Sequence, residues 1–139
     1  MKTAKYKYLK GITSDVMFEA YGKTPKELLE NAAEAMFETI CKKGKISTKK
    51  KIIVKVQGKD LKDLLFNWLQ QLIAQVDIQE MFFSKFDIKK ISETSLEAEV
   101  FGESISPAKG GTLVKALSYH DFGIKKGKEG YVATVTMDI

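Results

Sequence analysis

The chain has 139 residues, of which 44% are hydrophobic and 29% are charged, and its formal net charge is +5. This length predicts a single domain over residues 1–139, large enough to bury a core without covalent staples. The only cysteine, Cys41, excludes a disulfide within the chain, and neither a membrane-spanning apolar run nor a signal-peptide pattern is present, so we expect a cytoplasmic protein with no membrane contact.

All 23 basic residues are lysines. Arginine supplies the planar fork that reads guanine and clamps phosphate, so its absence argues against a dedicated reader of nucleic-acid sequence. Lysine still attracts polyanions without specificity, and the clusters at 49–51 and 125–126 permit weak contact with tRNA. A lysine-rich solvated surface explains the same charge, and we favour that interpretation.

Two short strands open the chain. Residues 5–10 (KYKYLK) predict a strand with a lysine-rich outer face, and residues 16–21 alternate side chains in the way that a half-buried strand does. The polar residues 11–15 predict the turn between them.

A helix follows. Thr24 can cap it, Pro25 suits its first position, and Glu27 stands at the capping-box position. Apolar residues then recur at helical spacing up to Ile40, and Gly44 can end the helix.

The middle of the chain predicts a strand over 51–56 and a second helix capped by Asp60. The apolar stripe of this second helix is broad, so we expect it to be the more deeply buried of the two. The stripe consists of Leu61, Leu64, Leu65, Trp68, Leu69, Leu72, Ile73 and Val76.

Strands dominate the rest. Residues 82–91 and 95–101 predict a hairpin, and a loop over 103–112 follows, punctuated by proline and glycine. Residues 113–119 and 122–126 are typical of two further strands. Two helices followed by a run of strands favour an α+β fold: a layered sandwich with both helices on one face of a largely antiparallel sheet, and some strands forming a second layer.

The final stretch, 131–139, alternates strictly and predicts a strand with one buried face. It ends by bringing the Asp138 side chain close to the α-carboxylate of Ile139. If this strand neighbours the second one, Asp15 joins them, and a hard divalent cation such as Ca²⁺ or Mg²⁺ would relieve the repulsion. Spacing alone favours a solvated or capping carboxylate, which is the commoner role of an aspartate in a turn.

The familiar catalytic signatures are missing: the sequence holds no phosphate-binding loop, dinucleotide fingerprint, zinc-protease helix or serine elbow. Cys41 stands at helical spacing beside an apolar stripe, as an inert packed thiol does. His120, the only histidine, precedes Asp121; a proton shuttle and a hydrogen-bonded histidine at a strand end both fit, and we favour the second.

Several segments match the motifs of a known family in order along the chain. They are TSDV (13–16) with EAYGKT (19–24), DLLFNWL (63–69), VKALSYH (114–120), the loop containing Gly102-Glu103 and Ser106-Pro107, and the closing TMDI (136–139). Together they resemble the archease family, whose N-terminal motif is HTADV…EAYGKT.

The resemblance implies a layered α/β sandwich and an accessory role rather than an enzyme. Archeases activate the GTP-dependent RNA ligase of tRNA splicing by promoting guanylylation and turnover of its catalytic subunit. The family's metal site, described as calcium, carries over onto Asp15, Asp138 and Ile139.

This chain departs from the family at two places. The family's motif histidine is replaced by Ile12, and the loop after Pro107 has Ala108-Lys109 where the family often has Arg-His. An alternative function is a general chaperone-like, protein-binding module, which would use an exposed apolar patch around Phe82 and Phe83.

Overall fold

The computed structural model describes residues 4–9 and 15–139, which form two α-helices, two short 3₁₀ helices and seven strands. In chain order they are β1 (Tyr6–Leu9), β2 (Asp15–Gly22), α1 (Pro25–Ile40), η1 (Lys43–Lys45), β3 (Lys50–Gln57), α2 (Leu61–Gln79), β4 (Met81–Ile91), β5 (Ser95–Ser104), η2 (Pro107–Lys109), β6 (Ala116–Gly127) and β7 (Gly130–Asp138). Of the predicted turn at 11–15, residues 11–14, including Ile12, lie outside the described residues, as does the strand end at Lys10, and Asp15 is the first residue of β2 rather than part of a turn.

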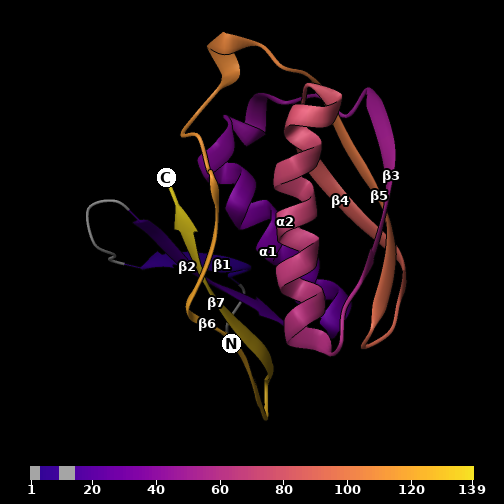
Figure 1. Ribbon diagram of the computed structural model, residues 1–139, viewed down its shortest axis with the longest axis vertical. Helices are drawn as coiled ribbons and strands as arrows, with labels where there is room; N and C mark the ends of the chain where they lie inside the picture. The colour runs from indigo at the N-terminus through magenta and orange to yellow at the C-terminus, as the bar shows by residue number, and fades with distance from the viewer. Residues whose placement is uncertain (1–3, 10–14) are drawn as a thin grey trace.

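The strands form two antiparallel sheets with the helices between them (Figure 1). The four-stranded sheet has the order β1-β2-β7-β6, and the three-stranded sheet has the order β3-β5-β4. The predicted α+β sandwich is confirmed, and its second layer is a complete three-stranded sheet. Because β7 lies between β2 and β6, the two ends of the described chain meet inside one sheet.

Both helix starts are confirmed. The Thr24 hydroxyl accepts a hydrogen bond from the backbone N–H of Glu27 at 3.2 Å, and the Glu27 carboxylate accepts one from Lys23 N–H at 3.0 Å. Asp60 caps α2 in the same way, accepting from Asp63 N–H at 2.8 Å. These reciprocal bonds satisfy N–H groups that have no partner within the helix.

The helix that is more deeply buried is α1, so the opposite expectation for α2 is wrong. Helix α1 packs against β2 of one sheet and β4 of the other, and its side chains are buried over most of its circumference. Helix α2 lies on the open side of this layer, and Ile73 and Val76 at its C-terminal end are only partly buried. A wide apolar stripe thus predicts a packing face, and the neighbours available to cover it decide the burial.

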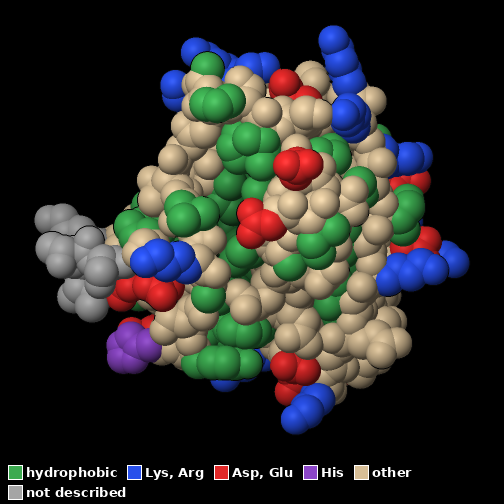
Figure 2. Space-filling model, turned by 45° about the horizontal axis from the view of Figure 1, so that its top comes forward, with side chains coloured by type: hydrophobic (Ala, Val, Ile, Leu, Met, Phe, Trp, Pro, Cys, Tyr) green, Lys and Arg blue, Asp and Glu red, His purple; other side chains and the backbone are tan. Residues whose placement is uncertain are grey.

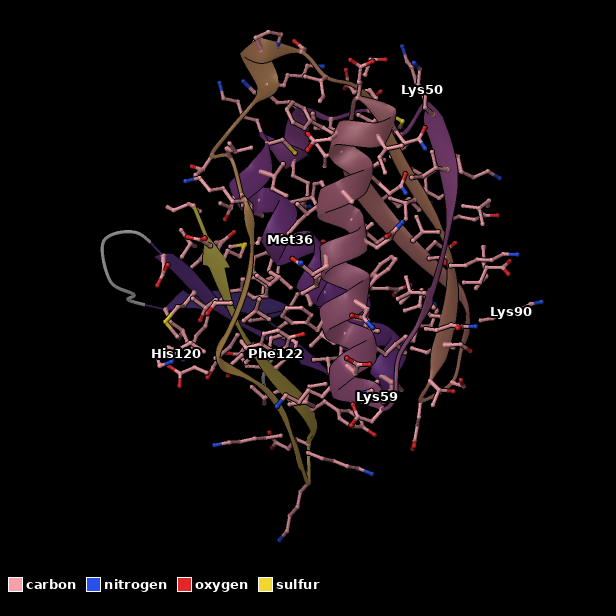
Figure 3. All side chains as sticks on the ribbon, viewed as in Figure 1. Met36, Lys50, Lys59, Lys90, His120 and Phe122 are labelled. Carbon is pink, nitrogen blue, oxygen red and sulfur yellow. The ribbon has the colours of Figure 1, made fainter. Side chains whose placement is uncertain are left out.

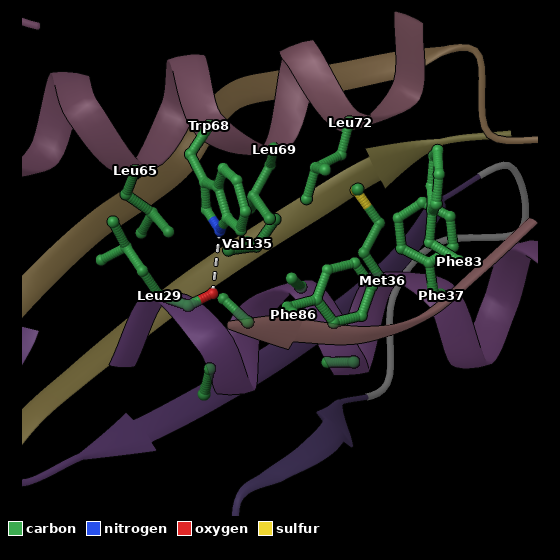
Figure 4. Close-up of a cluster of buried hydrophobic side chains, with 14 of the residues drawn as sticks. Leu29, Met36, Phe37, Leu65, Trp68, Leu69, Leu72, Phe83, Phe86 and Val135 are labelled. Atoms are coloured by element: carbon green, nitrogen blue, oxygen red, sulfur yellow. Dashed lines mark hydrogen bonds between the residues drawn. The ribbon is translucent and has the colours of Figure 1, made fainter. Parts of the chain in front are cut away.

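The core between the sheets is built from large side chains of both helices, β4 and β7 (Figure 4). Trp68 is fully buried, and its indole N–H donates to the Leu29 carbonyl at 2.9 Å, which ties α2 to α1. Phe82 and Phe83 are 8% and 0% exposed, so these two rings do not themselves form an exposed apolar patch. Their rings belong to the core instead.

Strand predictions differ from the structure mainly after the loop. Residues 113–115 have no regular structure, and the two predicted strands at 113–119 and 122–126 are one strand, β6. A bulge between Ser118 and Gly123 interrupts its pairing with β7, and Asp121 within it has a left-handed φ of 58°. Among the described residues, neither helix is long and apolar enough to span a membrane.

Candidate functional site

Asp15 and Asp138 stand directly opposite each other on neighbouring strands. The antiparallel register of β2 and β7 pairs Asp15 with Asp138 and Val16 with Met137, and β6 places Ala116 on the other side of Asp138. Opposite residues in such a pair point to the same face with Cβ atoms about 4.5–5.5 Å apart. The predicted meeting of the first and last segments is therefore confirmed.

Strand alternation decides which face carries the two carboxylates. Phe18 pairs with Val135, and both are fully buried against the helices. Since successive side chains alternate between faces, Asp15 and Asp138 lie on the opposite, outer face of the four-stranded sheet. Asp138 is exposed and Asp15 is half-buried, so both can reach a ligand from solvent.

The end of β7 is held in place. The side chain of Ile139 packs against the core, and the carbonyl of Asp138 accepts a hydrogen bond from Lys115 N–H at 2.8 Å. The main-chain carboxylate of Ile139 thus follows Asp138 at a fixed end of the sheet.

The two aspartates form neither an ion pair nor a side-chain hydrogen bond with any residue that the structure describes. Like charges directly opposite each other destabilise a sheet, so this pair is unfavourable until something neutralises it. Carboxylate oxygens are the ligands that hard divalent cations prefer. The described chain holds no cluster of three or more His, Cys, Asp and Glu side chains, so a third anionic donor would have to be the Ile139 carboxylate, and the role of the three as ligands stays a prediction.

Cys41 and His120 lie in very different surroundings. Cys41 is 2% exposed, and burial, reinforced by the nearby Glu38 carboxylate, raises the pKa of its thiol to about 12, which makes it an inert packed thiol. His120 lies at the periphery of the four-stranded sheet, exposed within the β6 bulge (Figure 3). Its Nε2 contacts the Asp121 carboxylate at 3.2 Å.

The loop that leads from β5 to β6 is tied down by Glu103. Its carboxylate accepts from Ser47 N–H at 2.6 Å and from Lys109 Nζ at 3.0 Å. These two donors, the backbone N–H first, hold the pKa of Glu103 below its usual value. Glu103 lies near the end of β5, in the segment whose resemblance to the family motif is loose, and its contacts fix the start of the loop that follows.

Sequence reasoning missed two features of the surface. Tyr119 stacks on Phe66 of α2 with ring centroids 4.1 Å apart and remains 72% exposed. A cavity of about 270 Å³ also opens between the C-terminal half of α2 and residues 105–114. Residue spacing predicts neither the stacked pair nor the cavity, because each depends on which distant elements pack against each other.

Comparison with known proteins gives one consistent result. Residues 6–139 match the model of the archease protein family. An archease of Methanosarcina acetivorans is 38% identical over 141 residues, covering 97% of this chain and 96% of its own length. An archease of Sulfurisphaera tokodaii is 37% identical over 131 residues, covering 91% of this chain and 94% of its own.

Solved structures agree with the fold. The solution structure of a Methanobacterium thermoautotrophicum protein superposes with a TM-score of 0.83 at 28% identity, covering 97% of this chain and 99% of that one. A Thermotoga maritima crystal structure, described as an archease and possible chaperone, has a TM-score of 0.67 at 21% identity, covering 94% of this chain and 97% of that one, and it supports the fold alone.

Proposed function

Because the chain belongs to the archease family, we propose that it activates the GTP-dependent RNA ligase of tRNA splicing in the cytoplasm. As an archease it is an accessory protein rather than an enzyme. Its action would be to promote guanylylation and turnover of the ligase's catalytic subunit. The proposal treats residues 1–139 as one domain, which the shared core of both sheets supports.

The proposed active feature is a divalent cation, calcium or another hard ion, held by Asp15, Asp138 and the main-chain carboxylate of Ile139. The observation that carries this is the register of β2 and β7, which sets side by side on an open face two carboxylates that have no ion-pair partner among residues 4–9 and 15–139. A bound cation there would supply positive charge at the end of the sheet, where it can stabilise charge that develops on phosphate.

The side chains themselves have separate roles. Asp15 and Asp138 supply oxygen ligands from two different strands, so the site exists only when β2 and β7 are paired. Packing of the Ile139 side chain and the Lys115 N–H bond to the Asp138 carbonyl hold the third donor close. The surface stays open to a second protein because Asp138 is exposed.

The test is the Asp138→Ala variant in a ligase guanylylation assay. We expect stimulation to be lost while the circular dichroism spectrum and unfolding midpoint stay close to those of the wild type, because the side chain is exposed. Asp121→Ala removes another exposed aspartate, whose carboxylate forms an ion pair with His120, and serves as the matched control with full stimulation. Full stimulation by Asp138→Ala would rule out the cation mechanism.

Contact with tRNA through lysines would be weak and secondary. Lys51 already pairs with Glu99 at 3.5 Å, and Lys126 lies over the ring of Tyr131 at 5.5 Å. Lys50 donates to the Ser104 hydroxyl at 2.7 Å, and Lys90 projects away from the three-stranded sheet, as Figure 3 shows; such scattered lysines give only nonspecific attraction. The chaperone-like alternative loses its assigned surface, because Phe82 and Phe83 are buried.

A further inference from the structure

An apolar groove runs between the C-terminal half of α2 and the irregular segment after β5. We call it the α2 groove. Its cavity of about 270 Å³ has room for about nine water-sized groups, which is the size of one or two large apolar side chains. Its walls are Ile73, Val76 and Asp77 of α2, Ile40 and Phe82 beneath, and residues 105 and 110–114 opposite.

Large apolar side chains at the rim of the groove are exposed to solvent, and packing within the chain does not account for this exposure. Leu113 is 72% exposed and Ile105 is 42% exposed, and both line the cavity. Hydrophobic side chains gather in the middle of the face seen in Figure 2, with acidic side chains beside them. Together with the uncovered end of the α2 stripe, these residues form a contiguous apolar patch of the kind that marks a protein-binding site.

The charges at the groove point to a cationic partner. Asp77 and Glu80 are both exposed at the C-terminal end of α2, and neither forms an ion pair with any described residue. The last turn of α2 carries no basic residue, although the helix dipole favours cations there. In a chain of net charge +5, this end of α2 is locally negative, so a Lys or Arg of a partner would satisfy the two carboxylates and the helix end together.

The outer wall of the groove leads along the chain to the end of β7, where Asp138 lies. Residues 110–114 form its outer wall, and the next residue, Lys115, bonds to the carbonyl of Asp138. Gly111 and Thr112 in turn donate to the carbonyls of Ile40 and Thr39, at 2.9 and 2.8 Å, which fixes this wall against α1. One protein that covers the end of β7 can therefore reach the groove along a single ordered segment.

We propose that the α2 groove binds a segment of the RNA ligase that carries one or two aliphatic or aromatic side chains and a Lys or Arg about one helical turn away. This inference rests on the proposed function, since it takes the ligase as the partner. The groove would supply affinity, with the apolar side chains filling the cavity and the cation meeting Asp77 and Glu80. The carboxylates at the end of β7 would supply the activation.

The test is a titration of the full-length protein into the ligase guanylylation assay, which separates the half-maximal concentration from the plateau. Leu113→Asp and Asp77→Lys should each raise the half-maximal concentration about tenfold or more and leave the plateau unchanged, because they weaken docking alone. Asp138→Ala should lower the plateau and leave direct binding to the ligase in place.

Matched controls come from the far side of the molecule. Ile53→Asp places the same charge at a side chain of β3 that is 52% exposed, and Glu93→Lys makes the same charge reversal in the β4–β5 turn. Both should behave as the wild type. If Leu113→Asp and Asp77→Lys also match these controls, the groove proposal is overturned while the proposed function stands.

Direct binding measurements separate the remaining outcomes. If the wild type binds the ligase without stimulating it, the proposed function fails, and weaker binding of Leu113→Asp still supports the groove. If the wild type does not bind the ligase, both fail. A dimer of the wild type that Leu113→Asp dissociates would assign the groove to a second copy and overturn the proposal.

Discussion

Trp68 shows how one side chain can connect the helical layer. Its ring is fully buried, and its N–H group reaches across to the Leu29 carbonyl on α1 at 2.9 Å. Phe86 of the three-stranded sheet packs edge-to-face against it with centroids 6.5 Å apart. The hydrogen bond gives α2 a fixed position on α1 that apolar packing alone does not specify.

Trp68→Phe should therefore destabilise the protein by about 1–3 kcal/mol, because it removes one buried hydrogen bond and leaves unfilled volume. Urea unfolding monitored by circular dichroism gives the free energy of unfolding. Tyr119→Phe, which keeps the stacked ring and alters only an exposed residue, should change it little. A Trp68→Phe protein as stable as the wild type would show that the bond to Leu29 is dispensable.

Strict alternation predicts the two strands that carry Asp15 and Asp138 and the faces of their side chains, but the pairing of these strands, which brings the two carboxylates together, is known only from the structure. The burial of Cys41 also follows from helical spacing. The stacking of Tyr119 on Phe66 could not be predicted, because it depends on a bulge in β6 that no local signal announces.

Among the elements, the segment from β5 to β6 owes its shape to specific polar contacts. Glu103 joins it to Ser47 and Lys109, and backbone bonds at Gly111 and Thr112 join it to α1. A Cβ atom at Gly111 would lie 2.5 Å from the Thr39 carbonyl oxygen, so only glycine permits this close approach. Alternating residues at 113–119 predict a strand, but these contacts keep 113–115 out of the sheet.

Glu103→Gln should lower stability at neutral pH, and the difference from the wild type should shrink as the pH falls. The folded pKa of Glu103 lies below its unfolded value, so its stabilisation is fully present above the unfolded pKa and is lost as the pH drops through the folded pKa. Thermal midpoints of both proteins at about pH 7 and about pH 3 check this. A difference that stayed constant over this range would mean that the ionised carboxylate is not what stabilises the loop.

The relative burial of the two helices could not be predicted from the sequence, for a related reason. Periodicity identifies the apolar face of α2 correctly, yet α1 is the helix that both sheets cover. Caps, strand ends and the β4–β5 hairpin depend on neighbours within a few residues, so the sequence predicts them well. What covers each face depends on the packing of distant elements.

For the molecule as a whole, the carboxylate pair links stability to a cation. If Asp15 and Asp138 bind calcium only in the folded state, a concentration of about 100 times Kd stabilises the protein by about 2.7 kcal/mol. For a chain of this size the thermal midpoint should rise by on the order of 10 °C.

Asp138→Asn should remove this response to calcium. It should also be more stable than the wild type in the presence of a chelator, because it relieves the repulsion across β2 and β7. Calorimetry with calcium and with a chelator measures both effects. An equal rise in the midpoint for Asp138→Asn and the wild type would place the calcium elsewhere on the protein.

The central position of β7 also affects how the chain folds while it is being synthesised. Its partner β2 is synthesised more than a hundred residues earlier, so a growing chain on the ribosome carries β1 and β2 without the strand that completes their sheet. The three-stranded sheet and α2 are contiguous in sequence and can form first, whereas closure of so long a loop is slow. A chain that stops short of β7 leaves β2 with an unpaired edge and the core without Val135 and Met137, and such a product should aggregate or be degraded by cellular proteases.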